Sequence, residues 1–387
     1  MKRIIILILA LMLLIVGCQS PNKDATTTKE HYFVSTKVEP TCTEDGYTAF
    51  TCTRCYFSYQ ENIVPATGHS FKTSADGTYK TCTACEYTET LPYTGGELET
   101  LSVHYIDVGQ GDCIFIKVGD CDIIIDAGYS EMGSRVTNYL KSLGVDDIEL
   151  MINSHAHADH YGGLPAVLRA YVVEEVWVSP LDSTNGGYKS FLTAVKNEGA
   201  IKKSPTKGTV YTYKGLTLTV IYDGSGTNDY NESSLVVMLQ YGSKKFLFTG
   251  DIGTSTENKL VKSNVNIQCD VLKVAHHGSA GSSAKDFVKA TGATYGVIGV
   301  GAGNDYGHPT SSALNRLSSA NISVYRTDKH GNVVFSTNGI TLSTPVINAS
   351  AEATNLVELF TLATADYQIS VDLSLIKKMR ESFSVIA

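Results

Sequence analysis

Four potential metal ligands lie within six residues of the chain, in the pattern His-x-His-x-Asp-His: His155, His157, Asp159 and His160. The two alternating histidines can point to one side of an extended backbone, while the last two residues follow where the chain must turn. Neutral imidazoles and a carboxylate suit Zn²⁺ and its neighbours, and paired ions with open positions can make hydroxide from water at neutral pH. Three of the ten histidines fall here, directly after a mostly apolar strand candidate. The pattern predicts a metal-dependent enzyme, not a histidine-rich surface loop.

Further acidic and histidine residues follow apolar strand candidates elsewhere in the chain. Asp251 follows residues 246–250, and the glycine before it leaves its carboxylate free to reach two metals as a bridging ligand. His276 and His277 come directly off the apolar run 271–275. Asp126 ends the run 123–125 and is the kind of carboxylate to which a histidine ligand donates its second ring nitrogen.

The composition is that of an ordinary globular protein. Of the 387 residues, 43% are hydrophobic and 18% are charged. The net charge of −8 argues against strong non-specific binding of nucleic acid, because such binding needs a basic protein surface. It does not exclude a nuclease, because bound metal ions could supply the positive charge locally.

The first residues predict export. A short basic start is followed by an apolar run, residues 4–16, that is too short to span a membrane comfortably, and by Gly17-Cys18. This resembles the bacterial lipobox, so residues 1–17 are expected to be a lipoprotein signal peptide and Cys18 the lipidated N-terminus. The alternative is an ordinary secretory signal. We therefore expect the outer face of a bacterial cell membrane, or secretion, with residues 18–30 as a polar tether.

Residues 31–92 form an imperfectly repeated module rich in cysteine. Each copy carries a Cys-x-x-Cys pair, Cys52 with Cys55 and Cys82 with Cys85, while Cys42 has no counterpart in the second copy. Units this small need zinc or disulfides to stay folded. The spacing favours one structural zinc held by the two pairs, with disulfides as the alternative. The expected role is spacing or contact with the cell wall.

From about residue 97 to 345 the sequence alternates strand-like and helix-like segments, which indicates two mixed sheets with helices outside. Residues 346–387 lack this alternation of strand-like and helix-like segments, and we assign them no function. Strands are predicted at 102–107, 113–118, 122–126, 149–153, 175–179, 216–222, 234–241, 245–249, 271–275, 295–300, 323–326 and 332–336. Helices are predicted at 134–143, 164–171, 189–197, 255–262, 283–290 and 311–319.

In this order, the motifs resemble the metallo-β-lactamase superfamily, and in particular the hydrolase domain at the C-terminus of ComEC-type competence proteins and its stand-alone relatives. The resemblance covers roughly residues 101–341 and implies an α/β fold, the αββα sandwich with metals at the sheet edge. Besides the opening motif, four segments make the resemblance to this hydrolase domain more specific: residues 104–112, 231–236, 276–279 and 306–309.

The resemblance implies two divalent metal ions. His155 and His157 would hold one, Asp159 and His160 the other, with Asp251 between them. His276 is the preferred last ligand, and His277 remains open. The superfamily usually supplies a further histidine before the bridging aspartate, but no histidine lies between His160 and His276. Asn231 occupies about that region, so the first metal is expected to be weakly held, or manganese instead of zinc.

Three further residues are expected near the reaction. His308, in a loop shaped by Gly307 and Pro309, is interpreted as a contact to substrate, such as a phosphate. Asp107 and Asp112 lie in a glycine-containing loop that is expected to support or line the site.

The predicted function is metal-dependent hydrolysis of a phosphodiester at the cell surface, with Asp159, His160 and Asp251 positioning a metal-bound hydroxide. DNA or RNA is one candidate substrate, and a phosphocholine or teichoic-acid ester is another. The carboxylate of Asp251 fits the phosphodiesterase-like branches better than the β-lactamases. The rival interpretation is an inactive surface-binding lipoprotein in which the repeat module does the work.

Overall fold

The computed structural model describes residues 32–73, 79–85, 87–91, 98–263 and 265–347. Contacts divide the chain into two compact units, and residues 32–72, 81–85 and 87 of the described chain belong to the first. The predicted signal peptide, the tether with Cys18 and nearly all of the tail lie outside the described residues. Among the helices of the described ranges, none is long and apolar enough to span a membrane.

The cysteine-rich module consists of two small three-stranded sheets that repeat one local structure. The first contains β1 (Phe33–Val38), β2 (Gly46–Cys52) and β3 (Ser58–Val64), and the second β4 (Phe71–Thr73), β5 (Tyr79–Cys82) and β6 (Thr88–Thr90). The backbone N–H of Cys52 donates to Phe57, and that of Cys82 donates to Tyr87. The equivalent hydrogen bonds confirm that the sequence repeat is also a structural repeat.

The larger unit contains an eight-stranded mixed sheet of order β12-β11-β10-β9-β8-β7-β20-β21. Strands β9, β10, β11 and β12 are parallel to one another, whereas β7, β8 and β20 form antiparallel pairs. The bounds are β7 (Leu101–Tyr105), β8 (Ile114–Val118), β9 (Cys121–Ile125), β10 (Asp147–Asn153), β11 (Val172–Val178), β12 (Ile201–Lys203), β20 (Val333–Thr337) and β21 (Val346–Ile347).

A second, seven-stranded sheet has the order β13-β14-β15-β16-β17-β18-β19. Its first four strands are antiparallel and its last four are parallel. The bounds are β13 (Val210–Tyr213), β14 (Leu216–Tyr222), β15 (Val236–Tyr241), β16 (Lys244–Phe248), β17 (Val271–Lys273), β18 (Tyr295–Ile298) and β19 (Ser323–Arg326).

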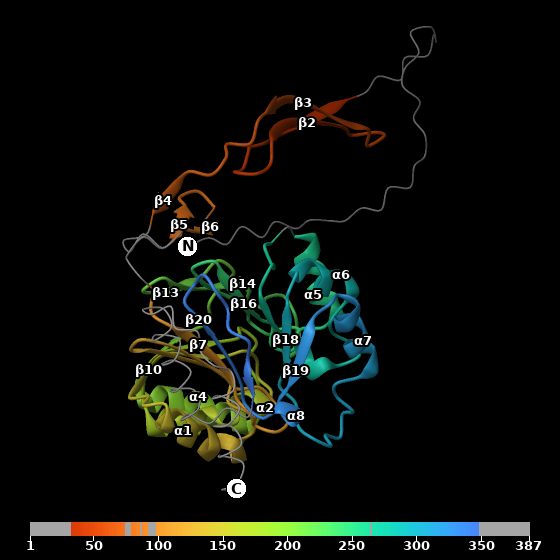
Figure 1. The fold of residues 1–387 in the computed structure, drawn as a ribbon. Coiled ribbons are helices and arrows are strands. Elements are labelled where there is room, and N and C mark those ends of the chain that lie inside the picture. Colours follow the sequence, from red (N-terminus) through yellow and green to blue (C-terminus); the bar gives the residue numbers. More distant parts are fainter. Residues whose placement is uncertain (1–31, 74–78, 86, 92–97, 264, 348–387) are drawn as a thin grey trace, which may run out of the picture. The chain divides into compact units, whose positions relative to one another are not determined.

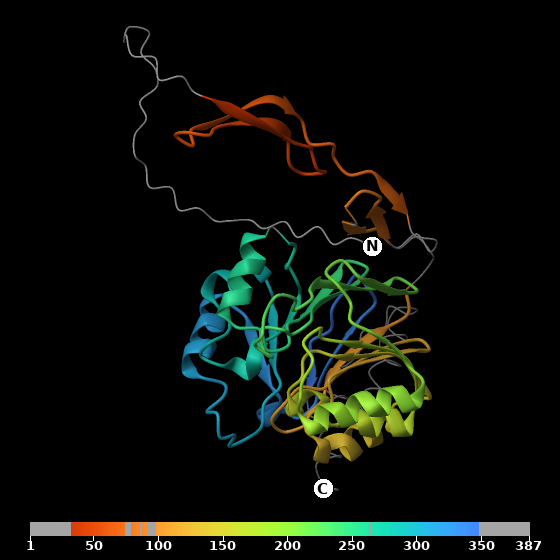
Figure 2. The same cartoon turned by 180° about the vertical axis from the view of Figure 1, so that it is seen from behind.

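Helices cover the outer face of each sheet, so the larger unit is an αββα sandwich (Figures 1 and 2). One apolar cluster, including Trp177 and Phe246, fills the space between the sheets. A second joins the first sheet to α1 (Gly133–Ser142), α3 (Leu164–Ala170) and α4 (Gly186–Glu198). A third joins the second sheet to α5 (Thr254–Lys262), α6 (Lys285–Thr291) and α7 (Ser311–Ser319). The predicted fold class is confirmed.

Candidate metal centre

The loop that follows β10 carries the opening motif to the edge of the sandwich, where the short helix α2 (Ala158–Tyr161) begins. His155 and His160 are fully buried there, and the Nε2 atom of His155 lies 3.0 Å from the Nδ1 atom of His157. The local spacing therefore does bring these imidazoles together, as the sequence predicts.

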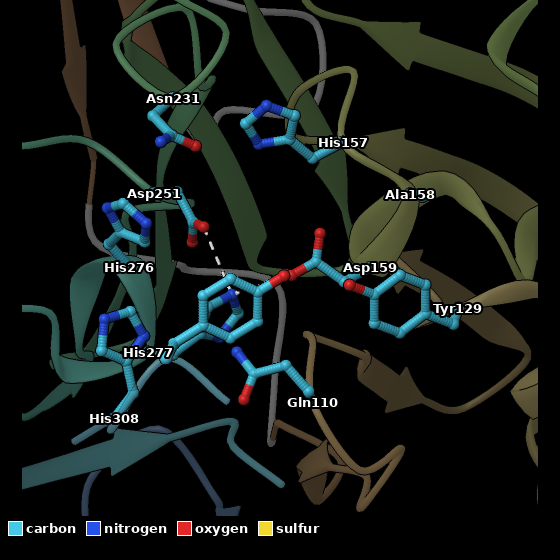
Figure 3. Close-up of a pocket in the computed structure, with 11 residues that line it drawn as sticks. Gln110, Tyr129, His157, Ala158, Asp159, Asn231, Asp251, His276, His277 and His308 are labelled. Atoms are coloured by element: carbon cyan, nitrogen blue, oxygen red, sulfur yellow. Dashed lines mark ion pairs between the residues drawn. The ribbon is translucent and has the colours of Figure 1, made fainter. Parts of the chain in front are cut away.

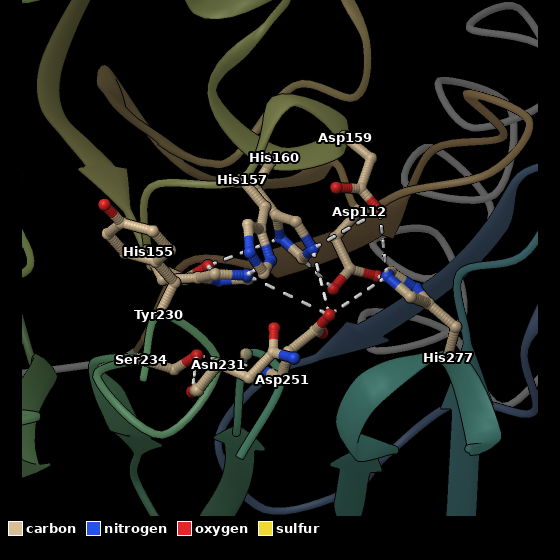
Figure 4. Close-up of polar contacts among 12 residues, drawn as sticks. Asp112, His155, His157, Asp159, His160, Tyr230, Asn231, Ser234, Asp251 and His277 are labelled. Atoms are coloured by element: carbon tan, nitrogen blue, oxygen red, sulfur yellow. Dashed lines mark hydrogen bonds and ion pairs between the residues drawn. The ribbon is translucent and has the colours of Figure 1, made fainter. Parts of the chain in front are cut away.

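Asp251 lies at the centre of the site, in the turn that follows β16 (Figure 4). Its Oδ2 atom is 3.3 Å from Nε2 of His160, 3.2 Å from Nε2 of His277 and 4.0 Å from Nε2 of His155. One carboxylate oxygen thus faces three imidazoles, which come from two segments of the chain. This is the arrangement expected of a bridging ligand between two metal positions.

Of the two neighbouring histidines, His277 and not His276 belongs with His160 and Asp251 to the group that could hold a metal ion. Its Nε2 atom lies 3.4 Å from Oδ2 of Asp159, and its Nδ1 atom is 2.7 Å from the carbonyl oxygen of Gly299. The sequence preference for His276 is thereby corrected. The reason is local: β17 ends at Lys273, and both histidines have left-handed backbones, with φ of 51° and 52°, so the chain turns before the second ring enters the site.

Asp126 orients His160, as expected of an outer carboxylate. Its Oδ2 atom lies 2.8 Å from Nδ1 of His160 and accepts a hydrogen bond of 2.6 Å from the Ser154 hydroxyl. The Ser154 backbone N–H donates to the other oxygen at 2.8 Å. With Nδ1 engaged, the Nε2 atom of His160 is left to face Asp251.

Asp112 is buried beside the centre but approaches the imidazoles from behind. Its carboxylate oxygens lie 3.8 Å from Nδ1 of His160 and 3.7 Å from Nδ1 of His277, on the ring sides that face away from Asp251. A carboxylate oxygen of Asp112 does lie within 4.8 Å of the potential ligand atoms of His160, Asp251 and His277. Because Asp112 approaches both rings from the side that faces away from Asp251, we interpret it as a supporting group and not as the second-position ligand. The Asp159 carboxylate lies on the other side of the His277 ring, with its Oδ2 atom 3.4 Å from Nε2, where a second-position ligand is expected.

Lys273 is a site residue that sequence reasoning missed. It is 1% exposed, forms an ion pair with Asp112, and lies 3.6 Å from Oδ1 of Asp251. Its ammonium group also donates to the Gly250 carbonyl at 3.1 Å. The available signal was a lone lysine within the otherwise apolar run 271–275, immediately before the paired histidines.

The 107–112 loop supports the centre through its backbone. The Asp112 N–H donates to the carbonyl of Asp159 at 3.2 Å, and a Cβ at Gly111 would come within 2.3 Å of that same oxygen. Asp107 accepts from the Gly109 N–H at 3.0 Å and lies 3.5 Å from Arg135, so it shapes the loop and is not among the residues that line the pocket.

A cavity of about 340 Å³ opens over the centre (Figure 3). Asn231 lines it, and its Oδ1 atom is buried without a hydrogen-bond partner, on the side of His157. His308 and His276 also line it, with ring centroids 5.6 Å apart. The residues around the cavity are Gln110, Tyr129, His157, Ala158, Asp159, Asn231, Asp251, His276, His277, Tyr306 and His308.

These groups fit divalent cations. The buried Nε2 atoms of His160 and His277 and Oδ1 of Asn231 have no hydrogen-bond partner, as expected of metal ligands. Burial alone would lower the pKa of His277, yet Asp251 and Asp112 raise it to about 10. Burial would likewise raise the pKa of Asp251, but His277 and His160 hold it well below its ordinary value. Such tightly packed anions and imidazoles favour cations in the centre.

In the module, the structure does not gather the four cysteines that the spacing predicts. Cys82 and Cys85 lie instead with Cys42 and His69, and Cys52 and Cys55 are outside this cluster. The predicted ligand set leaves out Cys42 because the second repeat has no counterpart of this residue. In the structure, the ligand atoms of the second repeat lie close to the Cys42 sulfur.

The chain belongs to the metallo-β-lactamase superfamily, whose family model matches residues 106–301. It is 29% identical to ComE operon protein 3 of Bacillus subtilis in a 252-residue alignment that covers 60% of this chain and 32% of that protein. It is 28% identical to competence protein ComA of Neisseria gonorrhoeae, covering 59% of this chain and 31% of that protein. The chain thus spans about a third of the length of these curated relatives.

Among solved structures, the metallo-β-lactamase fold protein YhfI of Bacillus subtilis matches with a TM-score of 0.43 and 13% identity, covering 62% of this chain and all of that one. Family and site together define a metal-dependent hydrolase related to competence proteins.

Proposed function

We propose that this protein hydrolyses phosphodiesters with two divalent metal ions. The carrying observation is the position of Asp251, whose single Oδ2 atom faces His155 on one side and His160 and His277 on the other. A carboxylate placed in this way could be shared by two divalent ions, which would supply the chemistry of in-line displacement at phosphorus.

The two sides of Asp251 differ in ligand strength. His160, His277 and Asp159 offer two imidazoles and a carboxylate, whereas His155 and His157 are completed by the neutral amide of Asn231. The first position is therefore proposed to bind its ion more weakly, and to accept manganese as well as zinc. When bound, such ions would activate a water molecule and stabilise charge on the attacking and leaving oxygens.

The cavity supplies hydrogen-bond donors for an anionic substrate. His276 and His308 stand together on its wall, and Nδ1 of His308 is buried without a partner. Burial, followed by the nearby Tyr306 hydroxyl, raises the pKa of Tyr129, so its phenol stays protonated as a donor. No lysine or arginine is among the residues that line the cavity, so positive charge would come from the ions. These groups support binding of the non-bridging phosphate oxygens.

The test compares three substrates on the purified protein, reconstituted with Mn²⁺ or Zn²⁺. We expect turnover of bis-p-nitrophenyl phosphate that is lost on chelation and restored by metal, with p-nitrophenyl phosphate and nitrocefin much poorer. Asp251→Asn serves as the inactive control. A protein that binds two ions but hydrolyses only nitrocefin, or no ester at all, would contradict the proposal. DNA, RNA and phosphocholine esters then identify the natural substrate class.

We further propose that the enzyme acts at the outer face of the cell membrane, held by lipid on Cys18, with the repeat module in contact with the wall. The support is the sequence pattern that ends at Cys18, which lies outside the described residues. Cys18→Ser should release the protein into the medium. Unchanged membrane fractionation of that variant would refute the anchor.

A further inference from the structure

Three cysteines and one histidine from both repeats meet in the module. Cys42 comes from the first repeat, whereas His69, Cys82 and Cys85 belong to the second, and their four ligand atoms lie within 4.8 Å of one another. We propose that these four residues form a tetrahedral zinc site that joins the two repeats. It is independent of the hydrolase centre and differs from the set of two Cys-x-x-Cys pairs that spacing alone predicts.

The distances between the ligand atoms match those around one zinc ion. Two sulfurs each about 2.3 Å from a tetrahedral zinc are separated by roughly 3.8 Å. The sulfurs of Cys42 and Cys82 are 3.7 Å apart. A sulfur and an imidazole nitrogen at such an ion are separated by about 3.5 Å, and Cys85 Sγ lies 3.3 Å from Nδ1 of His69.

Backbone and ring contacts hold these groups in place. The Cys82 sulfur accepts hydrogen bonds from the backbone N–H groups of Ala84 and Cys85. The His69 ring stacks on Tyr87 with centroids 4.6 Å apart, so its orientation is fixed by a neighbour in the same repeat. The second repeat therefore presents three ligands, and Cys42 closes the fourth corner.

The module has little else to hold it together. Among its described side chains, the buried apolar ones are Cys42, Cys52 and Cys82, whereas Phe33, Phe57 and Ile63 are exposed. A unit without an apolar core needs a metal or covalent links for stability. Zinc at this cluster would tie the turn around Cys42 to the second repeat, and its binding free energy would become folding free energy of the module.

The experiment is residue-resolved alkylation of the full chain, read by mass spectrometry, with zinc bound and after chelation. We expect Cys42, Cys82 and Cys85 to be protected by zinc and to become reactive when it is removed. Cys113 and Cys269, buried in the hydrolase unit, are internal controls that should stay unreactive in both states.

Cys85→Ser and Cys55→Ser are matched variants, because each removes an exposed thiol from one Cys-x-x-Cys pair. Cys85→Ser should expose Cys42 and Cys82 to reagent, whereas Cys55→Ser should leave both protected. With Co²⁺ in place of zinc, the thiolate-to-metal absorption band should weaken only in Cys85→Ser. This band reports the module alone, since the hydrolase ligands are histidine and aspartate.

Three results would overturn the site. Cys42 could react equally with and without zinc. Cys55→Ser could deprotect Cys82 and Cys85, as the set of two pairs requires. Peptide mapping without reductant could show a disulfide between Cys42 and Cys82 in protein produced with zinc.

Discussion

Replacing Lys273 with methionine should strongly destabilise the hydrolase unit. The Lys273 side chain is 2% exposed and the Asp112 side chain 3% exposed, and the two form an ion pair. Methionine keeps much of the volume but removes the charge, which leaves the Asp112 carboxylate buried without its cation. Breaking one partner of a buried ion pair costs about 3–5 kcal/mol. Each kcal/mol lowers the melting midpoint of a domain of this size by roughly 2–4 °C, so we expect a fall of about 6–20 °C.

The assay is chemical and thermal unfolding of the wild type, Lys273→Met, Asp112→Asn and the double variant, each with metal and after chelation. If Lys273 serves mainly to compensate Asp112, the double variant should be less destabilised than the sum of the single ones. Lys273 also donates to Gly250 at 3.1 Å, so part of its effect should persist in the double variant.

Two outcomes would refute this reasoning. Lys273→Met could unfold within about 1 kcal/mol of the wild type, although rupture of a buried pair requires more. The two substitutions could also be strictly additive, which would show that the two side chains do not stabilise each other.

Four further predictions concern the centre and its surroundings. Asp251→Asn should abolish diester turnover and lower the metal content more than Asp126→Asn does. Asp126→Asn removes only the carboxylate that orients His160, which should weaken metal binding by about 10–100-fold. Mass spectrometry of the bound metal ranks the two variants. His308→Ala should keep its metal and lose turnover by about 10²-fold if the ring binds the reacting phosphate, and unchanged kinetics would remove it from the site. Asn231→His should raise zinc occupancy at the first position, measured by titration against a chelator, because imidazole binds zinc better than an amide. Burial, and next the charge of Lys117, lowers the pKa of His104 to about 3, so this imidazole stays neutral in the folded protein, whereas in the unfolded chain it protonates near pH 6.5. The free energy of unfolding should therefore fall as the pH drops below about 6.5, by about 2 kcal/mol at pH 5. Denaturation of His104→Gln over the same pH range should lack this part of the loss.

The sequence predicted the layers of the hydrolase unit because its central elements are strongly apolar or periodic. The bounds of β14, β19 and α7 are as predicted. The strands it missed in this unit are short and poorly buried: Ile201–Lys203 is wholly exposed, Val210–Tyr213 is half-buried, and Val346–Ile347 has only two residues. Such strands carry no strong hydrophobic pattern, and pairing with a neighbour decides them.

The sequence by itself determined the part of the metal centre whose residues are close together along the chain. His155, His157, Asp159 and His160 lie within six residues, so one turn of backbone brings them together. Only the tertiary structure decided how distant segments complete it. The pairing of Lys273 with Asp112, the entry of His277 in place of His276, and the return of the second repeat to Cys42 all depend on contacts across the fold. Such contacts depend on sheet register, on the turn that ends each strand and on which segments pack together, and spacing along the chain does not specify them.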